Sequence, residues 1–148
     1  MDKEYILNLQ EGEEINDLVA ERVMGWHKGV HSRWENVEGL KNRPDWLDAD
    51  GHFMCGMKTN DGWYEDDEDF NLLHWHPSES ILWTWEIIEK IQDRFSFILS
   101  YDNPPTDDEH KWFCELYAKR EPFIDYEAHA STASLAICRA ALLSAINL

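Results

Sequence analysis

The chain has few basic residues for its length. Its 13 Lys and Arg residues stand against 30 Asp and Glu residues, which gives a net charge of −17. Binding to a nucleic-acid backbone needs a basic surface, so this balance argues against direct nucleic-acid binding. The charge fits two other hypotheses: solubility alone, or an acidic surface that mimics nucleic acid and occupies the basic groove of another protein.

Long apolar runs are also missing. No stretch of roughly 18 apolar residues occurs, and the first residues lack the basic and apolar regions of a signal peptide, so we expect no membrane association. The three cysteines, Cys55, Cys114 and Cys138, are far apart and form no CxxC motif. Such cysteines are typical of reduced, buried thiols, which favours a cytosolic protein.

The familiar catalytic motifs do not occur either. The chain has no Gly-x-Ser-x-Gly sequence, no phosphate-binding loop and no dinucleotide fingerprint. The acidic run at 65–69 does not have the spacing of an EF-hand. These absences predict a protein without enzymatic activity and without a cofactor.

What the chain does contain is enough apolar surface for one folded domain over residues 1–148. Its hydrophobic content is 43%, and it has eight tryptophans. Apolar residues at helical spacing predict helices over about 13–25, 78–93 and 131–147. Gly25 ends the first, Ser78 is a good N-cap for the second, and Ser131 or Thr132 caps the third.

Strands are predicted where the apolar period changes to two. Alternation predicts strands over 95–101 and 111–119, joined as an antiparallel hairpin by a long connection. Asp50-Gly51 predicts a turn beside a further strand at 52–58. We expect loop over 121–130, a short helical turn near 34–40, and core contacts or a minor strand at 5–9. The order helix, strand, helix, strand, strand, helix predicts a layered α/β or α+β domain.

Three stretches carry a family resemblance that spans nearly the whole chain. They are Met24-Gly25-Trp26 with the preceding helix, the segment from Phe70 through Pro77-Ser78 to Trp85–Ile91, and the Thr-Ala-x-Leu-Ala-Ile-Cys-Arg-Ala run at 132–140. Together they resemble the phage α-β-α (ABA) sandwich domain family, which has no established activity. The resemblance implies a three-layer α-β-α sandwich with a small, largely antiparallel sheet, and an accessory phage protein rather than a virion component.

Arg139 is the strongest candidate for a ligand-binding residue. It is the only charged residue in the last predicted helix, and a buried guanidinium must have partners. One interpretation is a structural salt bridge to Asp17, Glu86 or Glu89. The other is a clamp for a phosphate or carboxylate ligand.

Other residues could contact the same ligand as Arg139. Backbone donors at the starts of two helices, near Ser78 and Thr132, could bind the same anion, and Trp75 and Trp83 could stack on a base. Arg33 belongs to the densest group of positive charge in the chain, whose members are Arg22, Lys28, Arg33, Lys41 and Arg43. Core packing and capping are the plainer roles for these side chains.

The histidines suggest a metal-site alternative. His27 and His31 are four residues apart, as on one face of a helix, and His74 and His76 are two apart, as on one face of a strand. Together they could supply four ligands. Surface or capping histidines are the simpler interpretation.

Three functions therefore compete. The first is a non-enzymatic antagonist of host antiviral defence in the host cytoplasm, which binds a defence protein or sequesters a small nucleotide signal. The second is an acidic mimic of DNA, and the third is a small metal-dependent hydrolase. A stripe of small residues, Ala136, Ala140 and Ser144, also suggests a homodimer through helix 131–147.

Overall fold

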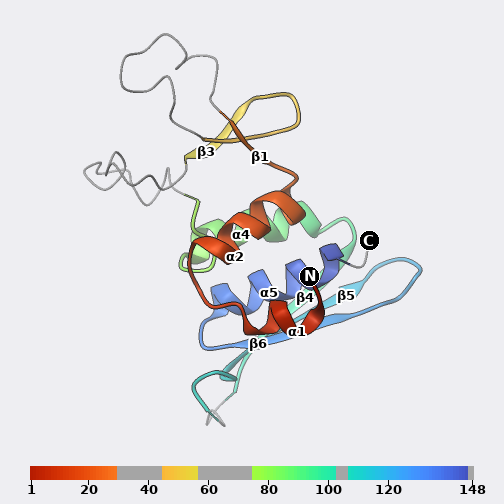
Figure 1. Ribbon diagram of the computed structural model, residues 1–148. Helices are drawn as coiled ribbons and strands as arrows, with labels where there is room; N and C mark the ends of the chain where they lie inside the picture. The colour runs from red at the N-terminus through yellow and green to blue at the C-terminus, as the bar shows by residue number, and fades with distance from the viewer. Residues whose placement is uncertain (30–44, 57–74, 103–106, 147–148) are drawn as a thin grey trace. The chain divides into compact units, whose positions relative to one another are not determined.

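The computed structural model describes residues 1–29, 45–56, 75–102 and 107–146 (Figure 1). Contacts divide the chain into two compact units. The larger unit is Met1–Met24 with His76–Leu148, and the smaller unit is Gly25–Trp75. Folding as one domain stays a prediction. The expected helical turn near 34–40 and the acidic run at 65–69 lie outside the described residues.

The larger unit begins with two helices joined by a short turn. α1 spans Lys3–Asn8, and the Asp2 carboxylate caps it by accepting a 2.9 Å hydrogen bond from the Tyr5 N–H. α2 spans Glu13–Val19 and continues as a π-helical turn, η1, over Ala20–Met24. Gly25 follows with a φ of 74°, a conformation that glycine adopts without steric cost.

A three-stranded antiparallel sheet forms the other side of the larger unit. Its strands are β4 (Phe95–Tyr101), β5 (Trp112–Ala118) and β6 (Tyr126–Ala130), in the order β4-β5-β6. β4 and β5 pair from Phe95 opposite Ala118 to Tyr101 opposite Trp112, and β6 pairs with the other edge of β5. The alternation of apolar residues therefore places one set of side chains against the helices.

α5 (Ala133–Ile146) lies at the centre of the larger unit. Every residue from Ser134 to Ser144 is buried, as expected for a helix that is apolar on all sides. β5 and β6 cover one side of it, and α1, α2 and α4 (Ile81–Ile91) contact it elsewhere (Figure 1). Elements of the same chain therefore cover both sides of α5, including its stripe of small residues. That stripe was the reason for expecting a second subunit against α5, so the structure gives this expectation no support. A homodimer stays a prediction.

The smaller unit contains a second antiparallel sheet with the order β1-β2-β3. Its strands are β1 (His27–Gly29), β2 (Asp45–Leu47) and β3 (Phe53–Gly56). The Lys28 ammonium lies 5.4 Å from the Trp46 ring centroid, a cation–π contact. The expected turn at Asp50-Gly51 joins β2 to β3.

The structure confirms the α+β class: helices pack on the β4-β5-β6 sheet of the larger unit, and the smaller unit contains a second small antiparallel sheet. The strands expected at 95–101 and 111–119 are confirmed, and so is their antiparallel pairing. Two expectations were wrong in detail. Residues 126–130 form β6 instead of loop, and α4 begins at Ile81 with Ser80 as its N-cap instead of Ser78. Of the two alternatives for 5–9, the core contacts are confirmed, because Ile6 and Leu9 are buried, while residues 3–8 form a helix and not a strand.

Candidate functional site

Arg139 points from the centre of α5 toward the free edge of β6 and the end of α1. Its Nε and Nη2 both donate to the Leu9 carbonyl, at 3.0 and 2.6 Å, and its Nη1 donates to the His129 carbonyl at 2.8 Å. The side chain is only 5% exposed. Arg139 therefore ties together two segments that are 120 residues apart in the sequence.

No carboxylate among the described residues forms an ion pair with this guanidinium. The expected salt bridge to Asp17, Glu86 or Glu89 was wrong, because backbone carbonyls take the place of the acid. Burial lowers the pKa of Arg139 from its usual value, and the negative charge of Glu109 opposes that shift. The buried guanidinium is thus stabilised by neutral carbonyl groups, and its positive charge is not balanced by a carboxylate of the described residues. An anionic ligand would be attracted by this charge.

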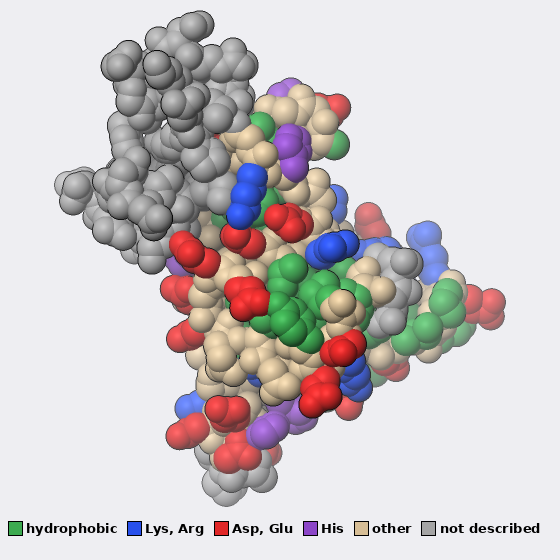
Figure 2. Space-filling view, viewed as in Figure 1, with side chains coloured by type: hydrophobic (Ala, Val, Ile, Leu, Met, Phe, Trp, Pro, Cys, Tyr) green, Lys and Arg blue, Asp and Glu red, His purple; other side chains and the backbone are tan. Residues whose placement is uncertain are grey.

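The guanidinium borders a cavity of about 300 Å³. We call it the Arg139 cavity, and it is lined by α1, the 107–111 turn, β6 and α5. The lining residues are Lys3, Leu7, Asn8, Glu109, His110, Glu127, Ala128, His129 and Arg139. Figure 2 shows histidine side chains grouped near β6, with acidic side chains beside them.

Two histidines stand at the mouth of the cavity. The Nδ1 of His110 lies 2.7 Å from a carboxylate oxygen of Asp107, and the ring centroids of His110 and His129 are 5.5 Å apart. The hydrogen bond with His110 is the largest cause of the lowered pKa of Asp107. The Asp107 carboxylate also accepts from the Glu109 N–H at 2.9 Å, so it orders the turn that carries His110.

The cavity can bind an anion of moderate size. Arg139 supplies fixed charge at its floor, while Lys3, His110 and His129 supply further donors. Glu109 and Glu127 limit the negative charge that the site accepts. Of these residues, sequence reasoning found only Arg139. The others come from a short helix and a strand that the pattern did not predict, and from the predicted connection before β5, where no motif singled them out.

Ser78 and Thr132 do not line this cavity. The Ser78 hydroxyl accepts a 3.0 Å hydrogen bond from the Gly12 N–H, and its own N–H donates to the Asn16 side chain at 2.9 Å. Thr132 caps α5 by accepting from the Leu135 N–H at 3.1 Å, as one of the two expected caps. Both hydroxyls are therefore engaged in joining or ending helices.

We expect Ser78→Ala to lower the free energy of unfolding by about 1–3 kcal/mol, because it leaves the Gly12 N–H without its buried acceptor. Urea denaturation monitored by circular dichroism measures the change. The matched control is Ser100→Ala on the exposed side of β4, which should stay within about 0.5 kcal/mol of the parent. Equal stability of the two variants would contradict the structural role of Ser78.

Trp75 and Trp83 are not among the residues that line the Arg139 cavity. Trp75 belongs to the smaller unit, where it is buried and meets Trp26 edge-to-face at 4.7 Å between ring centroids. Trp83 is a half-buried residue of α4. Arg33 lies outside the described residues, as do Lys41 and Arg43 from the same basic group. A base-stacking role for these tryptophans stays a prediction.

The histidine quartet is described only in part. His27 lies in strand β1, so the helix needed to place it beside His31 is not formed. His76 is buried, and its carbonyl accepts a hydrogen bond from the Glu79 N–H at 3.1 Å. His31 and His74 lie outside the described residues.

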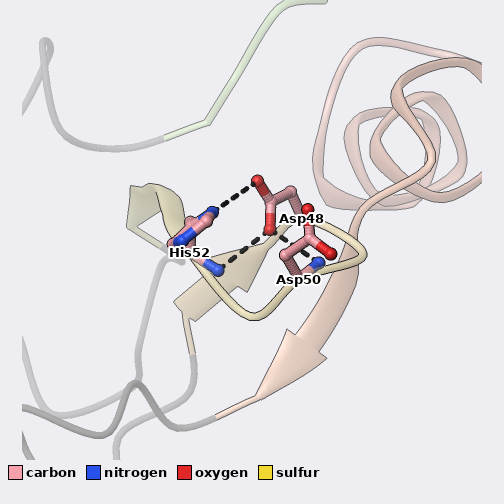
Figure 3. Close-up of side chains that lie close together, drawn as sticks. All are labelled: Asp48, Asp50 and His52. Carbon is pink, nitrogen blue, oxygen red and sulfur yellow. Dashed lines mark hydrogen bonds and ion pairs between the residues drawn. The ribbon is translucent and has the colours of Figure 1, made fainter.

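A different group of metal-type side chains lies in the β2–β3 turn. Asp48, Asp50 and His52 have ligand atoms within 4.8 Å of one another (Figure 3). The Asp48 carboxylate accepts from the backbone N–H groups of Asp50 and His52, both at 2.9 Å, and lies 3.2 Å from the His52 ring. These bonds lower the pKa of Asp48 and account for the cluster as a turn motif.

The three cysteines are all buried and free, as predicted. Burial raises the pKa of Cys114 to about 12 and raises that of Cys138 as well. Thiols of this kind are poor nucleophiles at neutral pH. Among the described residues, no helix is long and apolar enough to cross a membrane.

Comparisons with known proteins agree with this architecture. Among solved structures, the chain is similar to a phage protein from Bacillus cereus ATCC 14579, solved at 2.0 Å. The TM-score is 0.55 at 20% sequence identity, with 93% of this chain and 94% of that chain covered, so the likeness concerns the fold. No curated protein matches the chain. The family model of the phage ABA sandwich domain matches residues 17–142, and the chain therefore belongs to this family of phage proteins.

Proposed function

We propose that this phage protein is a non-enzymatic accessory protein that binds a small nucleotide-type anion in the Arg139 cavity. In the host cytoplasm it would antagonise antiviral defence by holding such a signal without turning it over. The observation that supports this is a guanidinium that is 5% exposed, has no ion-pair partner among the described carboxylates and borders a cavity of about 300 Å³. A cavity of this size suits a mononucleotide or one end of a larger one.

The lining favours binding over covalent catalysis. The described residues around the Arg139 cavity include no Ser, Thr or Cys, so they offer no hydroxyl or thiol nucleophile. They do offer cationic and imidazole donors, which suit phosphate oxygens. Sequestration therefore needs no group beyond those that the cavity supplies.

The test is titration of the protein with adenosine 5′-monophosphate and with inorganic phosphate at low salt, followed by calorimetry. We expect Lys3→Gln with His129→Gln to weaken nucleotide binding about tenfold or more, since two donors at the mouth are lost. Lys90→Gln in α4 removes the same charge away from the cavity and should leave binding unchanged. Phosphorus NMR of the mixture should show intact nucleotide.

Either of two results would overturn the proposal. One is no measurable nucleotide binding at millimolar concentration. The other is equal weakening by the Lys90 and Lys3/His129 variants, which would show that net charge alone attracts the ligand. Conversion of the nucleotide would show that the site is catalytic.

A defence protein as the target is the second candidate. The sheet face turned away from α5 leaves Ile98 half-exposed and Tyr117 accessible. Glu115 lies opposite Ile98, and Glu127 lies opposite Glu115 on the edge strand β6. Apolar anchors with an acidic rim suit a protein partner. For nucleic-acid mimicry we find less support, because acidic side chains on the face in Figure 2 are interspersed with other kinds.

A further inference from the structure

A second cavity lies at one end of the β4-β5-β6 sheet, built from residues that the proposed function does not use. Its volume is about 260 Å³. The start of β4, the end of β5 and the connection to β6 line it. The lining residues are Arg94, Phe95, Ala118, Arg120, Glu121, Pro122, Ile124 and Tyr126, and we call it the Phe95 cavity.

The floor of this cavity is aromatic. Phe95 and Tyr126 meet edge-to-face with ring centroids 5.8 Å apart, and Phe95 is only 7% exposed. The Arg94 guanidinium lies 5.5 Å from the Phe95 ring centroid. An edge-to-face pair beside a guanidinium offers surfaces on which a further aromatic ring can pack.

Backbone hydrogen bonds hold the walls in place. The Lys119 N–H donates to the Arg94 carbonyl at 2.9 Å, which joins the end of β5 to the start of β4. The Ile124 N–H donates to the Pro122 carbonyl at 2.8 Å, and the Asp125 carboxylate accepts from the Ala118 N–H at 3.2 Å. A cavity whose walls are fixed in this way needs little rearrangement to bind a ligand.

The charge at the Phe95 cavity differs from that of the chain as a whole. Two of the 13 basic residues, Arg94 and Arg120, line it, and neither makes an ion pair with a carboxylate of the described residues. Glu121 is the one acid among the lining residues. The Lys119 ammonium adds positive charge nearby, although it donates to the Gln92 carbonyl.

We propose that the Phe95 cavity binds a small aromatic anion, a single ring that carries a carboxylate or phosphate group. The ring packs on Phe95 and Tyr126 between Pro122 and Ile124, and the anionic group meets Arg94 and Arg120. The volume is slightly below the usual range for drug-sized ligands, about 300–1,000 Å³, and the aromatic pair with two arginines suits a ligand of one ring with one anionic group.

The test uses amide NMR spectra of the full chain titrated with phenyl phosphate, with benzoate and with neutral benzyl alcohol. We expect shifts at residues 94–95, 118–121 and 123–126 with both anions, and binding at least about tenfold weaker with benzyl alcohol. Arg94→Gln with Arg120→Gln should weaken binding of both anions by a similar factor. Arg22→Gln, at an exposed position of η1, is the matched control and should bind like the parent.

Several results would overturn the inference. They are the absence of shifts in this region, equal binding of benzyl alcohol, and unchanged anion binding by the double arginine variant. Because Lys3 and His129 lie in the other cavity, their replacement should leave these shifts in place. Failure here is thus distinguishable from failure of the proposed function.

Discussion

Replacing Arg139 by methionine is expected to lower the free energy of unfolding by about 2–4 kcal/mol. Methionine keeps an unbranched apolar stem but removes all three hydrogen bonds to the Leu9 and His129 carbonyls. The guanidinium no longer joins α1, β6 and α5, and the Leu9 and His129 carbonyls lose these donors. Urea denaturation of the purified variant measures the change.

Two further variants distinguish the loss of the buried hydrogen bonds from the loss of a positive charge. Arg120→Met removes an exposed guanidinium and should change stability by less than about 0.5 kcal/mol. Arg139→Lys keeps the charge but cannot reproduce the two bonds to Leu9, so we expect an intermediate loss. If Arg139→Met were as stable as the parent, the guanidinium would not hold these segments together.

Leu142→Ala is expected to lower the free energy of unfolding by about 2–5 kcal/mol, the range for removal of a buried leucine side chain. Leu142 is fully buried in α5 and lies near the end of the central helix. The surrounding helices and sheet can collapse only partly into the space, so a cavity remains. Chemical denaturation with fluorescence detection of the tryptophans gives the value.

Leu82→Ala is the control for this prediction. Leu82 lies on α4 with 62% of its surface exposed, so the same change of side chain creates no cavity. We expect an effect of about 0.5 kcal/mol or less. Similar losses for the two variants would mean that α5 is not the tightly packed centre that its burial implies.

The strands show where sequence patterns suffice and where they fail. β4 and β5 could be predicted because apolar residues recur at every second position, with Phe95, Phe97 and Leu99 in β4 and Trp112, Cys114 and Leu116 in β5. β6 was missed because its inward-facing residues, Ala128 and Ala130, are small and give no such alternation. Its strand conformation depends on pairing with β5, which is a tertiary interaction.

The short helix α1 was not predicted either, because it too depends on tertiary contacts. α1 has six residues, and helices of this length are marginal in isolation. Burial of Ile6 and Leu9 in the larger unit supplies the stabilisation that helix propensity does not. The same helix carries Lys3, Leu7 and Asn8 to the Arg139 cavity, so missing α1 also meant missing that part of the site.

The sequence by itself determined the class of the protein. The apolar, nearly uncharged run at 131–147 required a buried helix, the alternation at 95–101 and 111–119 required a hairpin, and the family motifs agreed with both. These features are local, so composition and period suffice to identify them. The sequence also singled out Arg139, because a lone charge in a buried helix must have partners.

Only the tertiary structure decided what those partners are. The acids expected for Arg139 are replaced by the carbonyls of Leu9 and His129, and the histidines at its cavity come from a turn and an edge strand. Backbone acceptors carry no signature in the sequence, because every residue has one. Which carbonyls face a given guanidinium depends on how distant segments pack, and that packing also places Arg94 and Arg120 around Phe95.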